Sequence, residues 1–211
     1  MLKVVALGIV NAGKSSLLSA LLDRPDAFPS GDVPRVTRSI QVEHAAGLTL
    51  VDTPGLDAEE KDVALAFEAA SSANQVLWCH SLRMGELRPT ELDALRRYRD
   101  SSQNRLWRTC FVLTHGDNVA SFDVVRTVSR RIAEQLGEIF NMAFIGVGEP
   151  VLDARPGQRK PRPFNVVGVR TYWRARAVNG GHNQSLAARS GVPRLRDFLR
   201  SLNGNQHRQP T

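Results

Sequence analysis

Cysteine is scarce in this chain, which carries two such residues, Cys79 and Cys110, among 211. Both lie inside short apolar runs, so we expect buried thiols rather than the disulfide framework of a small secreted domain. The histidines do not stand at ligand-like spacing from these cysteines, so no metal site built from His and Cys is predicted.

Long apolar runs are also lacking. No stretch approaches the roughly 20 apolar residues of a membrane-spanning helix, and the N-terminus leads directly into a predicted strand without a signal-peptide pattern. We therefore expect a cytoplasmic protein. A hydrophobic content of 42% and a charged content of 23% are ordinary for a soluble globular chain, and 211 residues suffice for one domain with its own core.

Acidic residues are nearly absent between positions 150 and 190, where eight basic residues accompany one acid, Asp153. This segment accounts for the whole net charge of +7. Phe164, Tyr172 and Trp173 are interleaved with its arginines. Basic and aromatic side chains together favour contact with RNA or the ribosome. A solvated basic loop, an acidic protein partner and an anionic membrane surface remain as alternatives.

A glycine-rich turn follows the first apolar run and opens an amphipathic stretch. Gly8 and Gly13 allow the backbone N–H groups to converge on a polyphosphate at a helix N-terminus. Lys14 would reach the β- and γ-phosphates, and Ser15 would bind Mg²⁺. The predicted nucleotide-binding residues of this phosphate loop are Gly8, Asn11, Ala12, Gly13, Lys14, Ser15 and Ser16.

Apolar strands alternate with helical patterns along the rest of the chain. The predicted strands are 2–7, 39–43, 48–51, 75–79, 109–114 and 142–147, and the main predicted helices are 14–23, 63–73, 90–98, 122–140 and 192–202. This alternation predicts an α/β fold, with helices on both faces of a mostly parallel sheet. The short turn at Ala46-Gly47 predicts one antiparallel strand pair.

Two further motifs stand at strand ends. Asp52 begins Asp-Thr-Pro-Gly55, and an acid beside a phosphate loop is suited to a Mg²⁺ site, while Gly55 would let its N–H approach a γ-phosphate. Thr114-His115-Gly116-Asp117 follows a later strand. Ligands of such sheets bind beyond the carboxyl ends of the strands, so all three motifs are expected to meet there.

These motifs resemble those of the translation-factor-related P-loop GTPases, in particular the Era-like and TrmE-like proteins. Asn11 ahead of Ala-Gly-Lys-Ser-Ser-Leu-Leu and Asp52-Thr-Pro-Gly55 with Leu56 carry the resemblance, over about residues 1–147 plus the closing helix. It implies the three-layer P-loop GTPase fold, GTP binding with Mg²⁺, and two switch loops ordered by the γ-phosphate. Thr37 matches the switch threonine that contacts Mg²⁺ and the γ-phosphate. We expect a single G domain at 1–202 with a basic insertion at about 150–190, and a polar tail at 203–211.

The base-reading motif departs from the Asn-Lys-x-Asp sequence of the family. Asp117 is placed to accept from the guanine N1 and N2 donors, while Thr114 replaces the asparagine and His115 the lysine. A histidine has a shorter apolar stem than lysine, so weaker nucleotide affinity is expected, by on the order of 1 kcal/mol. The Ser-Ala pair that closes the base pocket in the family is missing, and Gly146-Val147-Gly148 is predicted to take its place.

The resemblance implies slow GTP hydrolysis, with Lys14, Thr37 and Gly55 as the residues at the reacting phosphate. Leu56 stands where many relatives of Ras carry a water-positioning glutamine. Asn11 matches the asparagine that helps to hold K⁺ in potassium-activated members, so K⁺-stimulated turnover is predicted. The alternatives are a nucleotide-binding interaction module with little or no hydrolysis, acting through the basic segment, and an ATP-specific P-loop protein, which Asp117 disfavours.

Overall fold

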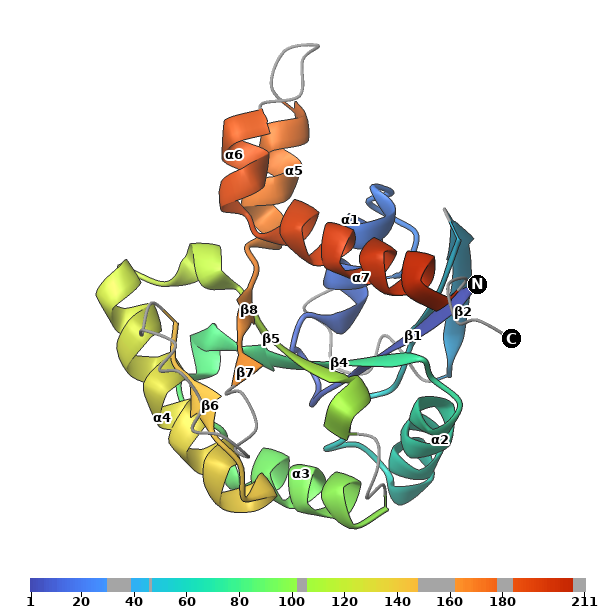
Figure 1. Cartoon of the computed structure of the whole chain (residues 1–211), viewed down its shortest axis with the longest axis vertical. Coiled ribbons are helices and arrows are strands. Elements are labelled where there is room, and N and C mark those ends of the chain that lie inside the picture. The colour runs from blue at the N-terminus through green and yellow to red at the C-terminus, as the bar shows by residue number, and fades with distance from the viewer. Residues whose placement is uncertain (30–38, 46, 102–105, 148–161, 178–183, 207–211) are drawn as a thin grey trace.

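The computed structural model of the chain describes residues 1–29, 39–45, 47–101, 106–147, 162–177 and 184–206. The described residues form a main sheet of six strands and a small sheet of two, and Figure 1 shows how the helices surround them. The main sheet contains β1 (Leu2–Leu7), β2 (Gln41–Ala45), β3 (Leu48–Asp52), β4 (Gln75–Ser81), β5 (Thr109–Thr114) and β8 (Asn165–Val166), and the small sheet contains β6 (Phe144–Ile145) and β7 (Arg162–Pro163).

The main sheet has the strand order β2-β3-β1-β4-β5-β8. β2 and β3 run antiparallel, and the other described pairs of this sheet are parallel. The α/β class, the mostly parallel sheet and the antiparallel hairpin are therefore confirmed. A parallel sheet of this kind directs the carboxyl ends of β1, β3, β4 and β5 to one edge, where the loops that follow them meet.

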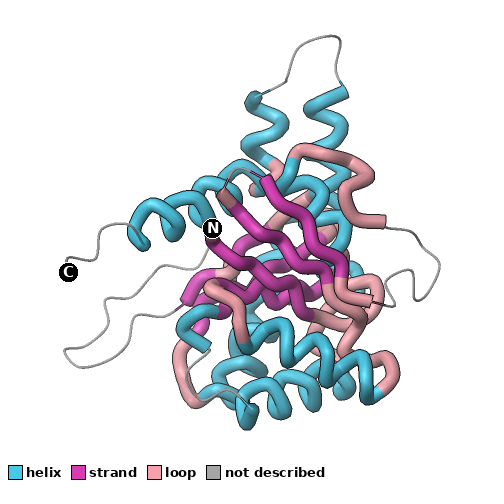
Figure 2. The backbone as a smooth tube through the Cα atoms, turned by 90° about the vertical axis from the view of Figure 1, so that its right-hand side faces the viewer, coloured by secondary structure: helices cyan, strands magenta, loops and turns pink. Residues whose placement is uncertain are grey.

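Helices cover both faces of the sheet (Figures 1 and 2). The seven α-helices of the described residues are α1 (Lys14–Leu22), α2 (Glu60–Ser71), α3 (Pro89–Ser101), α4 (Phe122–Phe140), α5 (Val169–Ala177), α6 (Gln184–Arg189) and α7 (Val192–Gln206), and the short 3₁₀ turns are η1 (Leu82–Met84), η2 (Leu106–Arg108) and η3 (Gly116–Asn118). Residues of α1, α5, α6 and α7 build the core on one face, and residues of α2, α3 and α4 build it on the other.

The side-chain alternation of β1 explains this layering. Val4 and Ala6 belong to the core under α1 and α7, whereas Val5 and Leu7 belong to the core over α2 and α3. All four are fully buried, as expected for a central strand covered on both faces. The strand therefore ends in the interior, and the phosphate loop that follows it is held against the sheet.

The last core strand is the main correction to the sequence-based fold. Residues 142–147 were expected to provide it, but β6 lies in the small sheet, and β8 is the neighbour of β5, with Val112 opposite Asn165 and Leu113 opposite Val166. Both candidates are short apolar runs, and sequence periodicity does not state which of them pairs with β5. The segment expected as an insertion at about 150–190 therefore includes a strand of the main sheet, followed by α5 and α6.

Neither cysteine forms a disulfide. Cys79 is fully buried in β4, and its burial raises the pKa of the thiol to about 12, while Cys110 is partly buried. Among the helices in the described residues, none has both the length and the apolar character required to cross a bilayer.

Candidate functional site

The phosphate loop joins the end of β1 to the start of α1. Three of its residues have positive φ angles, namely Gly8 at 146°, Asn11 at 62° and Gly13 at 81°. A Cβ atom at Gly8 would lie 2.3 Å from the carbonyl oxygen of Cys79, so a side chain cannot fit there. The loop can close around an anion because glycine takes the conformations that L side chains rarely adopt.

Lys14 begins α1 and turns back over the loop. Its Nζ donates hydrogen bonds to the carbonyl oxygens of Gly8, at 3.1 Å, and Ile9, at 3.0 Å. Burial lowers the pKa of the Lys14 ammonium, and the carboxylate of Asp52 opposes that shift. A buried ammonium that donates to backbone carbonyls is suited to bind a phosphate. The charged phosphate oxygens would replace the carbonyl oxygens as acceptors and form stronger, charge-assisted hydrogen bonds.

Ser15 and Asp52 form the donor set suited to Mg²⁺. The Ser15 hydroxyl donates to Oδ2 of Asp52 at 2.6 Å, and Asp52 is fully buried at the end of β3. Hydroxyl and carboxylate oxygens are the hard ligands that Mg²⁺ prefers, so this pair fits the ion. Thr37, the third predicted ligand, lies outside the described residues.

The Asp52-Thr-Pro-Gly55 loop lies directly on the phosphate loop. A Cβ atom at Gly55 would lie 2.3 Å from Cγ2 of Val10, and the N–H of Leu56 donates to the Gly8 carbonyl at 3.2 Å. Oδ1 of Asp57 accepts a hydrogen bond from the N–H of Val10 at 2.6 Å. Asp57 was not predicted as a site residue, and the only sequence signal for it is an acidic residue two positions after Gly55.

Asn11 is exposed at the tip of the phosphate loop, whereas the Leu56 side chain is buried. Leu56 therefore presents no polar group that could orient a water molecule. Ala12 is fully buried, and Ser16 is partly buried in the first turn of α1.

Thr114 ties the end of β5 to the phosphate loop. Its Oγ1 donates to the carbonyl oxygen of Ala12 at 2.7 Å, and the residue is 1% exposed. His115 has a φ of 56°, and its Nδ1 lies 3.0 Å from Oγ of Ser81 and 3.1 Å from Oγ1 of Thr114. A Cβ atom added to Gly13 would lie 3.0 Å from Cε1 of the ring, so His115 rests against the phosphate loop.

Asp117 faces helix α5. Its Oδ2 accepts a hydrogen bond from the N–H of Thr171 at 2.7 Å, in the first turn of that helix. Gly168 must lack a side chain, since a Cβ atom there would lie 2.8 Å from the carboxyl carbon of Asp117. The residues beside Asp117 therefore come from the segment after β8.

The chain beside Asp117 follows β8, whereas Gly146-Val147-Gly148 was predicted to close a base pocket there. The N–H of Val147 donates to Oγ of Ser129 on α4 at 2.8 Å, so this group is already used within the fold. Gly148 lies outside the described residues. Because β8 and not β6 adjoins β5, the chain that passes Asp117 is Val167-Gly168.

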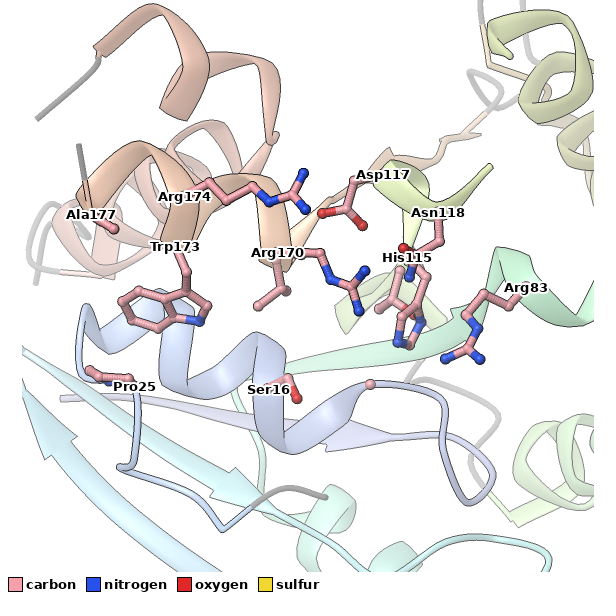
Figure 3. Close-up of a pocket in the computed structure, with 13 residues that line it drawn as sticks. Ser16, Pro25, Arg83, His115, Asp117, Asn118, Arg170, Trp173, Arg174 and Ala177 are labelled. Atoms are coloured by element: carbon pink, nitrogen blue, oxygen red, sulfur yellow. The ribbon is translucent and has the colours of Figure 1, made fainter. Parts of the chain in front are cut away.

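A cavity of about 550 Å³ connects the phosphate loop with Asp117 and α5. Figure 3 shows the Asp117 carboxylate directed toward the space between η3 and α5, with Arg170 extending into the cavity. Arg83, Arg170, Trp173 and Arg174 line it but were not predicted as part of a nucleotide site. The full lining is Gly13, Ser16, Pro25, Arg83, Thr114, His115, Asp117, Asn118, Val169, Arg170, Trp173, Arg174 and Ala177.

Known proteins resemble this chain in both sequence and fold. A family model described as 50S ribosome-binding GTPase matches residues 3–114. An uncharacterized protein of Acinetobacter baylyi is 31% identical over 139 residues, which cover 64% of this chain and 33% of that protein. The tRNA modification GTPase MnmE of Novosphingobium aromaticivorans is 32% identical over 133 residues, which cover 57% of this chain and 30% of MnmE.

The chain thus spans about a third of the length of these two curated relatives. Among solved structures, Toc33 from Arabidopsis thaliana in complex with GDP and Mg²⁺ superposes with a TM-score of 0.65 at 15% identity, over 97% of this chain and 85% of Toc33. The bacterial dynamin GTPase LeoA from ETEC superposes with a TM-score of 0.61 at 17% identity, over 96% of this chain and 36% of LeoA. At these identities the likeness concerns the fold.

Proposed function

Because the chain belongs to the 50S ribosome-binding GTPase family, we propose that it binds GTP and GDP with Mg²⁺ and hydrolyses GTP slowly as a conformational switch. The observation that carries this proposal is the shared cavity, in which Gly13 and Ser16 of the phosphate-binding segment face the same space as Asp117. A purine nucleotide with its phosphates on the loop can then bring its base to the carboxylate.

Guanine selection follows from the chemistry of Asp117. The N1–H and N2–H₂ groups of guanine are donors that a carboxylate can accept, whereas adenine would leave this carboxylate without those partners. The hydrogen bond from Thr171 fixes the carboxylate without occupying both of its oxygens. Thr114 and His115 stabilise the phosphate loop, since Thr114 donates to the Ala12 carbonyl and the His115 ring lies against Gly13.

Hydrolysis requires water to attack the γ-phosphorus while its bond to the β-phosphate oxygen breaks and GDP leaves. Lys14, Gly55 and the Mg²⁺ held by Ser15, Asp52 and Thr37 are the proposed groups that stabilise the charge on the phosphates. Leu56 cannot position the water, so intrinsic turnover is slow. We propose that K⁺ near Asn11 supplies further positive charge and stimulates the reaction.

One of the two proposed switch loops is the segment around Gly55. Leu56 and Asp57 both contact the backbone of the phosphate loop, so a γ-phosphate approaching Gly55 would compete with the Asp57 carboxylate for this space. Repulsion between the phosphate and the carboxylate would move the segment and report which nucleotide is bound.

A second candidate is an interaction module that binds nucleotide with little turnover. The buried apolar side chain at Leu56 favours it, because no described polar side chain replaces the glutamine there. Exposed arginines at Arg174 and Arg189 would then contact RNA, the ribosome or an acidic protein. Cytoplasmic localisation is part of either proposal.

The deciding experiment is a titration with GTP, GDP and ATP in the presence of Mg²⁺, followed by phosphate release in potassium and in sodium buffer. We expect micromolar or tighter binding of GTP and GDP, little binding of ATP, and faster release in potassium. The variant Asn11→Ala is the control for the potassium effect and should release phosphate equally in both buffers. Tight GTP binding without turnover would favour the interaction module, and equal affinity for GTP and ATP would contradict the assignment of Asp117.

A further inference from the structure

Helix α5 presents two different faces. Tyr172 and Ala175 are buried in the core, at 1% and 0% exposure. Arg170, Trp173 and Ala177 line the cavity together with Arg174, at helical spacings of three and four residues. This division makes the cavity-facing stripe a wall of the nucleotide pocket rather than an independent basic surface.

Hydrogen bonds hold the first half of the wall in place. At its start, the N–H of Thr171 donates to Asp117, and the N–H of Gly168 donates to the Ser190 carbonyl at 2.8 Å. Farther along, the Tyr172 hydroxyl donates to Oδ1 of Asp23 at 2.7 Å, at the end of α1. Since α1 follows the phosphate loop, these bonds fix α5 relative to both the phosphates and the base.

His115 lines the pocket across from α5 (Figure 3). Its ring is turned toward Ser81 and Thr114 and lies against Gly13. In Figure 3 the Arg170 guanidinium extends into the space between His115 and Ser16, and the Trp173 indole lies between α5 and Pro25. Planar guanidinium and indole groups stack on the faces of bases and cover sugars, and they bind such groups with little dependence on phosphate charge.

We propose that Arg170 stacks on the guanine base beside Asp117 and that Trp173 closes the ribose end of the pocket against Pro25. Helix α5 thereby supplies the cover that His115 does not. This inference rests on the proposed binding of guanine nucleotides. It also assigns these two side chains to the nucleotide rather than to RNA.

The first measurement uses the fluorescence of Trp173. Trp107 is 45% exposed and Trp78 is 1% exposed, so replacing Trp107 with Phe leaves Trp173 as the accessible indole of the described residues. Addition of GDP with Mg²⁺ should change the Trp173 emission and reduce its quenching by acrylamide. If a saturating concentration of GDP left the acrylamide quenching of Trp173 unchanged, the proposed role of Trp173 would be overturned.

The second measurement compares dissociation constants of GDP and GTP for variants of α5. We expect Trp173→Ala and Arg170→Ala each to weaken binding by about 10-fold, with the same factor for both nucleotides because the base and ribose are common to them. Trp173→Phe should stay close to the unaltered protein, since it retains a ring. Arg170→Lys should weaken binding as much as Arg170→Ala, because lysine keeps the charge but lacks the planar guanidinium group that stacks on a base. Arg200→Ala, an exposed arginine of α7, is the matched control and should change affinity by less than about two-fold.

Three results would overturn the inference. An unchanged affinity of Trp173→Ala would exclude the cover at the ribose. A full rescue by Arg170→Lys, with a larger effect on GTP than on GDP, would assign Arg170 to the phosphates. Unchanged nucleotide affinity with reduced RNA affinity in both alanine variants would assign the stripe to RNA. If the unaltered protein bound no guanine nucleotide, the proposed function itself would fall, and this inference with it.

Discussion

Lys14 combines a charge with almost complete burial, since 7% of the residue is exposed and backbone carbonyls accept from its ammonium. Such a group is unfavourable for folding, because a buried cation loses more hydration than neutral dipoles restore. It is favourable for binding, because a phosphate supplies negative charge in addition to that of Asp52. Removing the charge of Lys14 should therefore raise the stability of the fold and lower the affinity for nucleotide.

The variant Lys14→Met tests this opposition, because methionine has a similar length and no charge. We expect GDP affinity to fall by about 100-fold, the usual effect of losing a charge-assisted hydrogen bond. The free energy of unfolding measured without nucleotide should be equal to or greater than that of the unaltered protein. A clear loss of stability would show that the ammonium supports the fold of the loop.

The pH dependence of this stability difference has a defined sign. Burial lowers the pKa of Lys14 in the folded chain below 10.5, the value for the unfolded chain. At a pH between these two pKa values the unfolded chain binds more protons than the folded chain, so the free energy of unfolding rises with pH. The advantage of Lys14→Met should therefore shrink as pH rises toward 10.5. Urea unfolding of both proteins at several pH values measures it, and a widening difference would contradict the assignment.

Asp117→Asn tests base reading without disturbing α5. The amide oxygen can still accept from Thr171, but its NH₂ group faces guanine donors where the carboxylate offered an acceptor. GDP affinity should fall on the order of 100-fold, and ADP affinity should not change. Equal losses for both nucleotides, measured by calorimetry, would mean that Asp117 acts only through the position of α5.

Among the elements, α3 is fastened to β4 by a buried pair. Nδ1 of His80 lies 2.8 Å from Oε2 of Glu91, and Nε2 lies 2.8 Å from the Gly85 carbonyl, with 2% and 0% exposure of the two residues. Both ring nitrogens of His80 therefore lie at hydrogen-bond distance from an oxygen atom. The pair also adjoins the site, because the His80 carbonyl oxygen lies 3.2 Å from Oγ1 of Thr114.

Glu91→Gln should reduce the free energy of unfolding by about 1 to 3 kcal/mol, since both carboxylate oxygens face buried nitrogen atoms and the amide keeps one acceptor oxygen. The double variant His80→Leu, Glu91→Leu should lose less than Glu91→Gln alone, because both polar groups are then removed. Denaturant unfolding of His80→Leu, Glu91→Leu and the double variant measures the coupling energy. Additive losses would argue against a coupled pair.

Helix α5 is fastened to α1 and α7 through Tyr172. Its hydroxyl donates to Asp23 and accepts from Nη2 of Arg196 at 2.8 Å. Tyr172→Phe should lower the free energy of unfolding by about 1.5 kcal/mol and increase hydrogen exchange in α5. Exchange that rises equally in α2, which Tyr172 does not contact, would point to general destabilisation instead.

Burial raises the pKa of the Tyr172 phenol above 10.0, and the hydrogen bond to Asp23 acts in the same direction, while the bond from Arg196 opposes it. The folded chain therefore retains this proton longer than the unfolded one, so the stability contributed by the phenol is complete below pH 10.0 and is lost as pH rises through the raised pKa. The difference between the unaltered protein and Tyr172→Phe should narrow over that range.

For the whole molecule, nucleotide binding and folding are linked. GDP with Mg²⁺ at 100 times its dissociation constant should add about 2.7 kcal/mol to the free energy of unfolding, which corresponds to a rise in melting temperature of about 5 to 10 °C for a chain of this size. Chelation of Mg²⁺ by EDTA should reduce the rise, because Ser15 and Asp52 then lack the ion. ADP is the control and should produce little shift. An equal shift with ADP would contradict guanine selection.

Much of this molecule could be predicted from local sequence. The phosphate loop, Asp52 and Asp117 each follow a strand, and parallel strands bring their carboxyl ends together, so the shared edge followed from the order of elements. The strand next to β5 could not be predicted in this way. Residues 142–147 and 166–169 both contain short apolar runs, and which of them supplies the strand beside β5 depends on backbone pairing between residues more than fifty positions apart.

The sequence by itself determined the chemistry of the loop, because glycines with positive φ, a lysine and a serine at fixed spacing have few other structural uses. It also determined the layered fold, through the periodicity of its apolar residues. Only the tertiary structure decided what lies beside Asp117, what meets Val10 and which face of α5 is buried. Those contacts join segments distant along the chain, and side-chain packing selects them. Arg170 and Trp173 thus read as part of a basic segment in the sequence and as a wall of the cavity in the fold.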